Sequence, residues 1–394
     1  MNDKCKISIV SLGCAKNHVD AEIMLGFLNE AGYCITENKE EADVIIVNTC
    51  GFIESAKTEA IEAILEAAEY KSNGKCKAVI ATGCLTQRYA QDIIEEIPEA
   101  DGVLGIDGYS RIVEAVEACL NGEKYVFCEY TGDISYLDCA RILSGPKGSA
   151  YLKISEGCDN RCAYCAIPDI RGPFRSRKKE DVIAEAMRLA AAGVKELVVV
   201  AQDTSRYGKD LYGKPVLAEL LYDLNKIDGI KWIRVMYLYP DEIAAELIEA
   251  MKKCEKVVHY VDLPLQHING RILKQMNRRG TPEDIKRVLQ QFKNELEDCV
   301  IRTSLIVGFP SETEEEFEEL LEFVEQTHFD RLGAFCYSPE EGTPACKMKG
   351  KVKKSVKLER YNRIMECQQV ISREINQARV GRVYDVLVEG VSDD

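Results

Sequence analysis

The feature that most constrains the fold of this chain is an alternation of short apolar runs with amphipathic helical patterns, repeated in two blocks. In the first block the β-branched run 44–47 suits a strand that is buried on both faces. Ile61, Ile64 and Ala68 then recur at helical spacing. Such an alternation predicts a doubly wound parallel α/β domain. The strands and helices expected here are, in pairs, 6–10 with 21–31, 43–47 with 55–70, 78–81 with 87–97, and 102–106 with 110–120.

A second alternation begins at Tyr151 and contains six strand candidates. Six strands are too few to close an eight-stranded barrel, so we expect an open, six-stranded (βα) partial barrel with its chemistry at the carboxyl ends of the strands. The expected strands are 151–154, 196–201, 232–237, 260–263, 300–308 and 331–337. The expected helices are 179–192, 216–226, 241–253, 282–297 and 314–327.

Changes in sequence pattern suggest the domain boundaries. Gly145, Pro146 and Gly148 break the alternation and predict a linker between the two blocks. A long charged helical pattern runs from Val352 to Val380 after the second block. The expected order is an N-terminal domain over 1–137, a linker over 138–149, a partial-barrel domain over 150–345, a helix within 346–380 and a C-terminal segment 381–394 with a strand at 383–388.

The chain contains 17 cysteines among 394 residues. The apolar run near the N-terminus covers only 7–10, and no stretch approaches the roughly 18 to 20 apolar residues that a membrane span requires. We therefore expect a cytoplasmic protein without membrane association. An odd cysteine count in such a chain indicates metal ligation or plain burial rather than a disulfide framework.

The negative charge is concentrated in the first third of the chain. Residues 1–140 contain 11 Lys and Arg against 25 Asp and Glu, a net charge of -14, whereas the whole chain carries -15. An acidic surface repels a phosphate backbone, because nucleic-acid binding depends on Lys and Arg. A nucleic-acid partner is therefore not favoured, and a basic protein is the better partner. The alternative is that the charge only keeps the surface soluble.

Three cysteines stand at the spacing Cys-x3-Cys-x2-Cys directly after the first strand of the second block, at Cys158, Cys162 and Cys165. Iron–sulfur clusters are held by cysteine thiolates, and a four-iron cluster normally needs four of them. Three ligands leave one iron free to bind a substrate or cofactor, which indicates catalysis. The alternatives are a zinc site with a fourth ligand elsewhere, or reduced cysteines in the core.

Three other cysteines, Cys14, Cys50 and Cys84, each follow the end of a predicted parallel strand in the first block. Ligands of open α/β sheets bind beyond the carboxyl ends of the strands, so these cysteines are expected to converge on a second metal cluster. A glycine adjoins each one, which allows close approach. The alternative is coincidental burial. The remaining 11 cysteines share no spacing and are interpreted as small buried hydrophobic residues.

These cysteine patterns resemble the radical S-adenosylmethionine superfamily and, within it, the methylthiotransferase family. The branch that modifies ribosomal protein S-twelve is the most similar, on motifs spread over most of the chain. The tRNA-modifying branch, including the MiaB type, usually has Gln-Asn where this chain has Gln202-Asp203. The motifs are SLGCAKNHVDAE, NTCGFIESAK, GCLTQRYA, YLKISEGCDNRCAYCAIPDIRGPFRSR, AQDTSRYG, LPLQH and IVGFPSETEEEF.

The resemblance implies an enzyme with two 4Fe-4S clusters that methylthiolates the β-carbon of one aspartate. Cys158, Cys162 and Cys165 would be its catalytic cluster ligands, where S-adenosylmethionine yields a 5'-deoxyadenosyl radical. The site of Cys14, Cys50 and Cys84 would deliver the sulfur, and a second S-adenosylmethionine would supply the methyl group. A radical is required because an unactivated C–H bond is too weakly acidic for a general base to remove its proton. An electron donor of the reductase, flavodoxin or ferredoxin type would be a further partner.

Other residues are matched to the S-adenosylmethionine site by the same resemblance. Gln202 and Asp203 follow the second barrel strand, where related enzymes bind the methionine amino group; alternatively, they only cap the end of that strand. Tyr164 is similar to an aromatic residue that lies near the adenine, or else is a packing residue. The arginines of 171–177 are expected to face substrate or cofactor, with a solvated loop as the alternative.

The C-terminal segment 381–391 resembles the opening strand of a TRAM domain, a small β-barrel that would here be truncated. Ala15 also departs from the family pattern, in which a proline usually follows the first cysteine. Two other functions stay open from the sequence. One is methylthiolation of a tRNA adenosine, and the other is a non-catalytic iron–sulfur or zinc protein.

Overall fold

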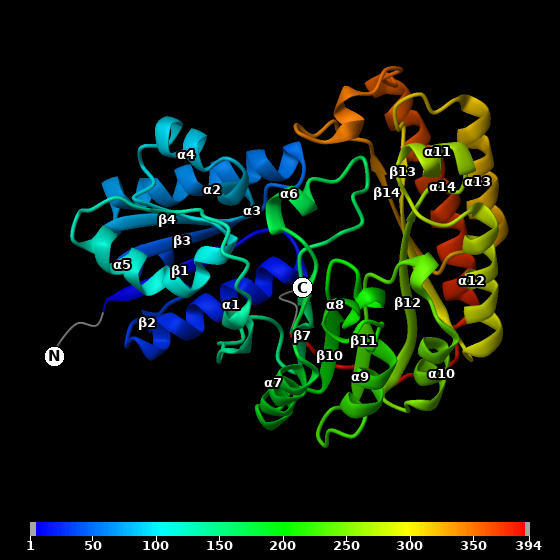
Figure 1. The fold of residues 1–394 in the computed structure, drawn as a ribbon, viewed down its shortest axis with the longest axis horizontal. Helices are drawn as coiled ribbons and strands as arrows, with labels where there is room; N and C mark the ends of the chain where they lie inside the picture. Colours follow the sequence, from blue (N-terminus) through cyan, green and yellow to red (C-terminus); the bar gives the residue numbers. More distant parts are fainter. Residues whose placement is uncertain (1–4, 391–394) are drawn as a thin grey trace. The chain divides into compact units, whose positions relative to one another are not determined.

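Two six-stranded parallel sheets, each in its own unit, organise the chain in a computed structural model that describes residues 5–390 (Figure 1). The first unit extends to Gly145 and also includes Glu156–Cys158 and Ala166–Arg177. The second unit contains Pro146–Ser155, Asp159–Cys165 and the chain from Lys178 onward. The chain therefore returns to the first unit twice after it has entered the second. A separate two-stranded sheet pairs β8 (Ser155–Glu156) with β9 (Arg175–Ser176).

The first sheet has the strand order β2-β1-β3-β4-β5-β6, with every neighbouring pair parallel. After β1 the chain adds β2 on one side of β1, and it then crosses to add β3 on the other side. This reversal creates a switch point between β1 and β3. Two strands, β2 and β6, were not predicted, because runs of two and three residues are too short to show a period. The strands are β1 (Lys6–Ser11), β2 (Cys34–Ile35), β3 (Val44–Thr49), β4 (Ala78–Gly83), β5 (Gly102–Leu104) and β6 (Tyr125–Phe127).

Helices cover both faces of this sheet, which confirms the doubly wound prediction. Along β3, Val44 and Ile46 join the core formed with α1 and α5, whereas Ile45 and Val47 join the core formed with α2 and α4. Alternate side chains of a strand point to opposite faces, so both faces of β3 are buried. The helices are α1 (Ala15–Glu30), α2 (Glu54–Asn73), α3 (Cys84–Arg88), α4 (Ala90–Glu96), α5 (Ile112–Leu120) and, from the returning chain, α6 (Ile167–Arg171).

The second sheet has the order β7-β10-β11-β12-β13-β14, so its strands follow one another in space as they do in sequence. All neighbouring pairs are parallel, and one continuous apolar core joins the strands to the helices between them. This is the open partial barrel that the sequence predicts. Its strands are β7 (Ser149–Lys153), β10 (Glu196–Val200), β11 (Trp232–Val235), β12 (Val257–Gln266), β13 (Val300–Val307) and β14 (Arg331–Cys336). Its helices are α7 (Lys179–Ala191), α8 (Lys209–Tyr212), α9 (Leu217–Leu224), α10 (Ala245–Lys253), α11 (Gly270–Gln275), α12 (Pro282–Glu295), α13 (Glu314–Thr327) and α14 (Lys354–Ala378).

The C-terminal segment differs from its prediction. The charged helix is present as α14, but the strand expected at 383–388 is wrong, because those residues have no regular structure. Val383 is 96% exposed and Val388 75% exposed. A strand needs a partner for its backbone N–H and C=O groups, and within residues 5–390 no strand pairs with this segment. The TRAM assignment stays a prediction, and its last residues, 391–394, lie outside the described chain.

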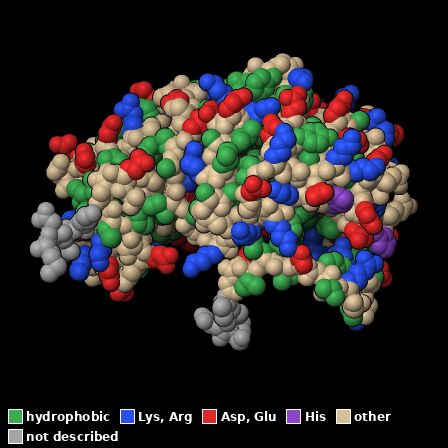
Figure 2. All heavy atoms as spheres, turned by 90° about the horizontal axis from the view of Figure 1, so that it is seen from below, with side chains coloured by type: hydrophobic (Ala, Val, Ile, Leu, Met, Phe, Trp, Pro, Cys, Tyr) green, Lys and Arg blue, Asp and Glu red, His purple; other side chains and the backbone are tan. Residues whose placement is uncertain are grey.

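The surface combines both signs of charge. On the face that Figure 2 shows, Asp and Glu side chains are interspersed with Lys and Arg. Within the described part of the chain, no helix has the length and apolar character needed to cross a lipid bilayer.

Candidate functional site

The loops after β1, β3 and β4 carry three cysteines that we call the N-terminal cysteine site: Cys14, Cys50 and Cys84. Cys14 directly precedes α1, Cys50 follows β3, and Cys84 begins α3. The loops touch at their glycines. A Cβ atom on Gly13 would lie 2.8 Å from the Cβ of Cys50, and one on Gly51 would lie 2.7 Å from the Cα of Leu85. The structure thus brings the three strand ends together at the switch point of the sheet.

Two buried asparagines lock the first two loops to each other. The Asn17 amide donates to the backbone oxygens of Leu12 (2.6 Å), Asn48 (3.3 Å) and Thr49 (3.2 Å). The Asn48 amide donates back to the Asn17 oxygen at 2.7 Å. Buried polar groups are costly unless they are paired, so these reciprocal bonds fix the loops that carry Cys14 and Cys50.

The three thiols of this site have different electrostatic surroundings. Burial raises the pKa of Cys14, but the Lys16 ammonium and the Arg171 guanidinium outweigh it, and the pKa lies below its ordinary value. Burial raises the pKa of Cys50. It raises the pKa of Cys84 to about 11, against the opposing effect of Arg171. Each of the three therefore senses the charge of Arg171, and Cys14 also senses that of Lys16.

Arg171, the last residue of α6, is fully buried within the first unit. Its Nη2 donates to the Cys84 sulfur at 3.5 Å and to Asp20 Oδ2 at 3.1 Å. Its Nη1 donates to Glu156 Oε2 at 2.8 Å. Burial lowers the pKa of Arg171, but Cys84 and the two carboxylates raise it well above its ordinary value, so the guanidinium stays charged.

The N-terminal cysteine site fits a sulfur-rich cluster on the donors that it offers. All three cysteines are free thiols, and small residues adjoin each of them. The Arg171 Nε is buried without a hydrogen-bond partner, so a donor is left for an acceptor that the protein itself does not provide. Within residues 5–390 no three His, Cys, Asp or Glu side chains are grouped closely enough to hold a single metal ion.

Cys158, Cys162 and Cys165 form what we call the loop cysteine site, in the chain between β8 and α6. Cys158 belongs to the first unit, where its N–H donates to the Gly172 oxygen at 3.1 Å. Gly157 has a φ of +74°, and a Cβ atom there would collide with the Pro173 carbonyl oxygen, so only glycine suits this turn.

The other two loop cysteines belong to the second unit, and Cys162 is surrounded by groups that the sequence analysis missed. The Cys165 N–H donates to the Cys162 oxygen at 3.0 Å. The Tyr239 hydroxyl lies 3.6 Å from the Cys162 sulfur. Arg278 Nη1 donates to the same sulfur at 3.9 Å, and its guanidinium stacks 3.8 Å from the centre of the Tyr239 ring. No spacing rule connects positions 278 and 162, so no local pattern indicates this arginine.

Tyr164 lies between the two loop cysteines of the second unit and is half-buried. Burial raises its pKa well above the ordinary value, with a further contribution from Cys162, so the phenol stays protonated. It packs against a small apolar cluster that includes Phe309 and Tyr337. Its predicted place beside an adenine stays a prediction.

Gln202 and Asp203 follow β10 in the second unit and differ in how well their polar atoms are satisfied. The Gln202 amide nitrogen is buried without a hydrogen-bond partner. Asp203 is almost fully buried and accepts hydrogen bonds from Asn160 Nδ2 (2.8 Å) and from the Ser205 hydroxyl. Arg279 Nη2 lies 3.7 Å from the same carboxylate, yet burial still raises the pKa of Asp203. Of the two residues, only Gln202 has a buried side-chain atom without a hydrogen-bond partner.

The arginine-rich loop is not a solvated loop. Beside the buried Arg171, Arg175 stacks 5.0 Å from the centre of the Tyr130 ring and donates to the Arg171 oxygen. Arg177 Nε donates to Asp138 Oδ1 at 2.9 Å. All of these partners lie in the first unit, so the loop packs into that unit.

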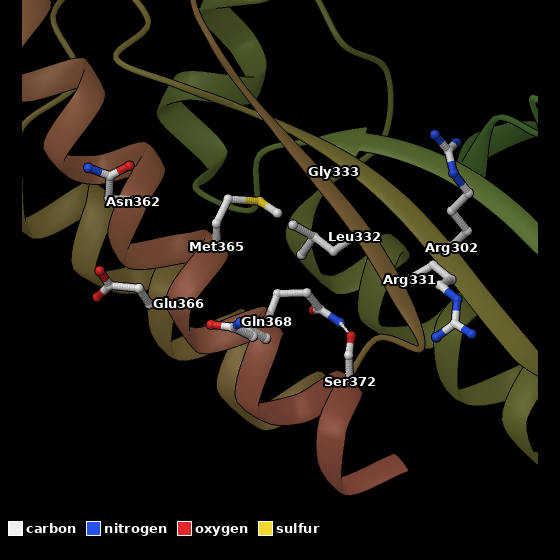
Figure 3. A pocket seen from close by; sticks show the side chains of 10 residues that line it. Arg302, Arg331, Leu332, Gly333, Asn362, Met365, Glu366, Gln368 and Ser372 are labelled. Carbon is white, nitrogen blue, oxygen red and sulfur yellow. Dashed lines mark hydrogen bonds between the residues drawn. The ribbon is translucent and has the colours of Figure 1, made fainter. Parts of the chain in front are cut away.

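A surface groove in the second unit lies apart from every predicted site residue (Figure 3). It has a volume of about 530 Å³ and lies between β13, β14 and α14. Arg331 is the first residue of β14 and Arg302 the third of β13, so the groove is at the amino ends of strands whose carboxyl ends form the predicted catalytic rim. Arg302 is already paired with Asp262 at 2.6 Å.

Comparison with known proteins identifies both halves of the chain. Residues 6–105 match the profile described as uncharacterized protein family UPF0004, and residues 152–324 match the radical SAM superfamily. A protein of Acetivibrio thermocellus named "Ribosomal protein uS12 methylthiotransferase RimO" is 54% identical over 99% of this chain and 88% of its own length. Proteins of the same name from Pelotomaculum thermopropionicum and Clostridioides difficile are 52% and 50% identical, over 98% and 99% of this chain and 87% and 88% of their own lengths.

Solved structures share the fold at low sequence identity. The radical S-adenosylmethionine methyltransferase TsrM from Kitasatospora setae superposes with a TM-score of 0.62 at 14% identity, covering 84% of this chain and 73% of its own. The cobalamin-dependent S-adenosylmethionine radical enzyme OxsB reaches 0.55 at 12% identity, covering 94% of this chain and 56% of its own. At these identities the likeness shows the fold alone.

Proposed function

This chain belongs to the RimO family of radical S-adenosylmethionine methylthiotransferases, and on that basis we propose that it transfers a methylthio group to ribosomal protein uS12. The target we infer is the β-carbon of one aspartate. The observation that carries the proposal is the position of Cys14, Cys50 and Cys84 on loops of the first unit that touch one another, because a second cysteine site distinguishes sulfur insertion from simple radical generation. Relatives that share this name match nearly the whole chain.

The cofactors of this family are two 4Fe-4S clusters and S-adenosylmethionine. The N-terminal cysteine site would hold one cluster and the loop cysteine site the other, each through three thiolates. When bound, these groups supply the radical that removes the substrate hydrogen and the sulfur that replaces it. The protein supplies ligands, orientation and a surrounding of low polarity.

The residues near the loop cysteine site would bind and orient S-adenosylmethionine. The unpartnered Gln202 amide N–H can donate to a carboxylate, which is a charge-assisted hydrogen bond. Asp203 holds Asn160 by a 2.8 Å hydrogen bond, and Asn160 lies in the same loop as Cys162, so this contact fixes the loop. The protonated Tyr239 phenol and the Arg278 guanidinium both offer hydrogens to the Cys162 sulfur.

The net charge of the N-terminal residues and the names of the relatives support a proposal for the molecules that bind this chain. Residues 1–140 carry a net charge of -14, which suits a basic protein substrate better than RNA. The reaction needs electrons that neither substrate provides, so we infer a small flavodoxin- or ferredoxin-type donor. A ribosomal protein substrate places the enzyme in the cytoplasm.

The test is anaerobic reconstitution followed by turnover with S-adenosylmethionine, a reductant and whole uS12. We expect about eight irons per chain, from two four-iron clusters. We also expect uS12 to gain the mass of one methylthio group in place of a hydrogen, located at an aspartate by fragmentation. Modification of tRNA instead of uS12 would support the tRNA-modifying branch. Binding of zinc alone, without cleavage of S-adenosylmethionine, would exclude both enzymes.

A further inference from the structure

Arg171 connects the N-terminal cysteine site to the strand that leads into the loop cysteine site. It donates to Cys84 on one side and to Glu156 on the other, at 3.5 Å and 2.8 Å. Glu156 ends β8 and accepts the N–H of Gly157, which immediately precedes Cys158. All of these residues lie in the first unit. The Arg171 side chain therefore contacts Cys84, a predicted ligand of one site. It also contacts Glu156, which lies two residues before Cys158, a predicted ligand of the other site.

The surroundings of Arg171 fix its charge and its position. Asp20 and Arg171 have side chains that are 0% exposed, and that of Glu156 is 1% exposed. The Tyr136 hydroxyl adds a third contact to Glu156 at 3.2 Å. A buried guanidinium without partners would be very costly, and the two carboxylates offset part of that cost and hold the guanidinium in one orientation. The Nη2 atom divides its donation among Asp20, the Asn17 side-chain oxygen at 3.3 Å and the Cys84 sulfur.

We propose that Arg171 is a positioning residue for the cluster at the N-terminal cysteine site, which orients Cys84 and raises the reduction potential of that cluster. Hydrogen bonds to the ligand sulfurs and nearby positive charge favour the reduced cluster, because reduction adds negative charge. Arg171 provides both at Cys84. The inference rests on the proposed function in one respect only, namely that Cys14, Cys50 and Cys84 hold an iron–sulfur cluster.

The experiment isolates this cluster in the full chain. The parent is the variant C158A/C162A/C165A, which retains only the N-terminal cysteine site, and R171K is introduced into it. Lysine keeps the positive charge but cannot donate to Cys84 and Glu156 together as the guanidinium does. Iron content is measured after anaerobic reconstitution, and the midpoint potential is measured by redox titration with electron paramagnetic resonance.

R141K in the same parent is the matched control. Arg141 is also a buried arginine of the first unit, paired with Glu22 of α1 at 2.9 Å. Its partner Glu22 is not a predicted cluster ligand. R141K therefore measures the general effect of replacing a buried arginine, and we expect the parent midpoint potential to be retained.

We expect R171K to keep about four irons. At a fixed potential we expect its ratio of reduced to oxidised cluster to fall about tenfold, which is a shift of about 59 mV to lower potential for one electron. Asp20→Asn should shift the potential in the opposite direction, because the neutral amide competes less for Nη2. This second variant also decides the matter if R171K does not fold.

The outcomes separate the inference from the proposed function. A parent that binds about four irons, with unchanged midpoint potentials in both R171K and Asp20→Asn, overturns the role of Arg171 and leaves the proposed function standing. A parent that binds no iron overturns both. Opposite shifts in the two variants, with R141K unchanged, support the inference, because general destabilisation does not move a potential in two directions.

Discussion

The two cysteine sites are built in different ways. The cysteines of the loop cysteine site lie within eight residues of one another in one loop, so their spacing is local. Those of the N-terminal cysteine site are separated by 36 and 34 positions and come from three strand ends. Their approach depends on the strand order of the sheet and on glycines at the loop contacts. The first kind of site tolerates changes elsewhere in the fold, whereas the second requires the fold to be intact.

At both sites an arginine donates a hydrogen bond to a cysteine sulfur, but the groups around the two arginines differ. Each has one arginine that donates to one cysteine sulfur: the buried Arg171 donates to Cys84, and the half-buried Arg278 donates to Cys162. Arg171 is balanced by two carboxylates, whereas Arg278 stacks on Tyr239 and donates to the Pro264 oxygen at 2.6 Å. The arginine charge is thus balanced by carboxylates at the N-terminal cysteine site, and it is accommodated by an aromatic ring and a backbone carbonyl at the loop cysteine site.

The largest effect should come from removing one site at a time. C158A/C162A/C165A should retain about four irons and lose cleavage of S-adenosylmethionine entirely. C14A/C50A/C84A should also retain about four irons and should still cleave S-adenosylmethionine, but should not methylthiolate uS12. Iron analysis and mass spectrometry of the nucleoside and protein products provide the readouts. C336A, at an exposed cysteine, is the control and should match the parent chain.

The outcome that would contradict this separation is loss of all iron from either triple variant. That result would mean that the six cysteines hold one shared group and that the two sites are not independent.

The next largest effect should come from the glycine that touches Cys50. Gly13 and Gly32 have φ values of +89° and +90°, but a Cβ atom on Gly13 would lie 2.8 Å from the Cβ of Cys50, whereas nothing lies within 4 Å of one on Gly32. Gly32→Ala should therefore cost about 1 kcal/mol of unfolding free energy, from backbone strain alone. Gly13→Ala should cost about 2 kcal/mol more because of the collision.

Urea unfolding of the apoprotein measures both costs, and iron analysis after reconstitution shows whether Gly13→Ala empties the N-terminal cysteine site selectively. Equal free energies for the two variants would show that the loops after β1 and β3 do not need this close contact.

A smaller effect concerns the reactivity of the thiols in the apoprotein. The pKa of Cys84 is raised to about 11, and that of Cys14 is below the ordinary 9.0. Deprotonation increases as pH rises through the pKa, so at pH 8 about one Cys84 in a thousand is a thiolate, against more than about one in ten for Cys14. A thiolate of lower pKa is intrinsically less nucleophilic, which leaves an advantage of about tenfold in alkylation rate for Cys14.

Timed alkylation with iodoacetamide, followed by peptide mass spectrometry, tests this order. The rate at Cys84 should continue to rise between pH 8 and pH 11, while the rate at Cys14 levels off at lower pH. Faster modification of Cys84 at pH 8 would contradict the electrostatic difference between these two ligands.

The smallest effect tests the second unit. Because the Gln202 amide nitrogen is buried without a partner, Gln202→Ala should remove one hydrogen bond to S-adenosylmethionine. One hydrogen bond contributes about 1 kcal/mol, so the dissociation constant should rise about fivefold. Calorimetry of the reconstituted enzyme measures it. Gln326→Ala is the matched control, since that amide is exposed on α13 and bonds to Glu322. Unchanged affinity in Gln202→Ala would remove Gln202 from the binding site.

The sequence predicted long elements well and short or unpaired ones poorly. The buried strands β3 and β10 are recognisable as continuous β-branched runs. β2 and β6 have two and three residues and form only because a neighbouring strand offers its edge. The segment 383–388 shows the converse, since it has the composition of a strand but no partner. Strand formation depends on pairing, which no local pattern contains.

The cysteines were accessible to sequence reasoning, but the arginines beside them were only partly so. A strand end in a parallel sheet predicts where Cys14, Cys50 and Cys84 point. Arg171 was noticed as part of a basic loop, yet its contact with Cys84 joins positions 87 residues apart. Arg278 and Cys162 are 116 residues apart and were not connected at all.

The sequence by itself determined the two parallel α/β architectures, the candidate ligands and the family. It could do so because hydrophobic period and cysteine spacing are local properties of the chain. Only the tertiary structure decided which arginine donates to a sulfur of each cysteine site, that both Asp203 oxygens accept hydrogen bonds while the Gln202 amide nitrogen has no partner, and that the arginine-rich loop packs into the first unit. Charge, burial and hydrogen bonding of a side chain depend on groups brought together from distant positions, and those are fixed only when the chain has folded.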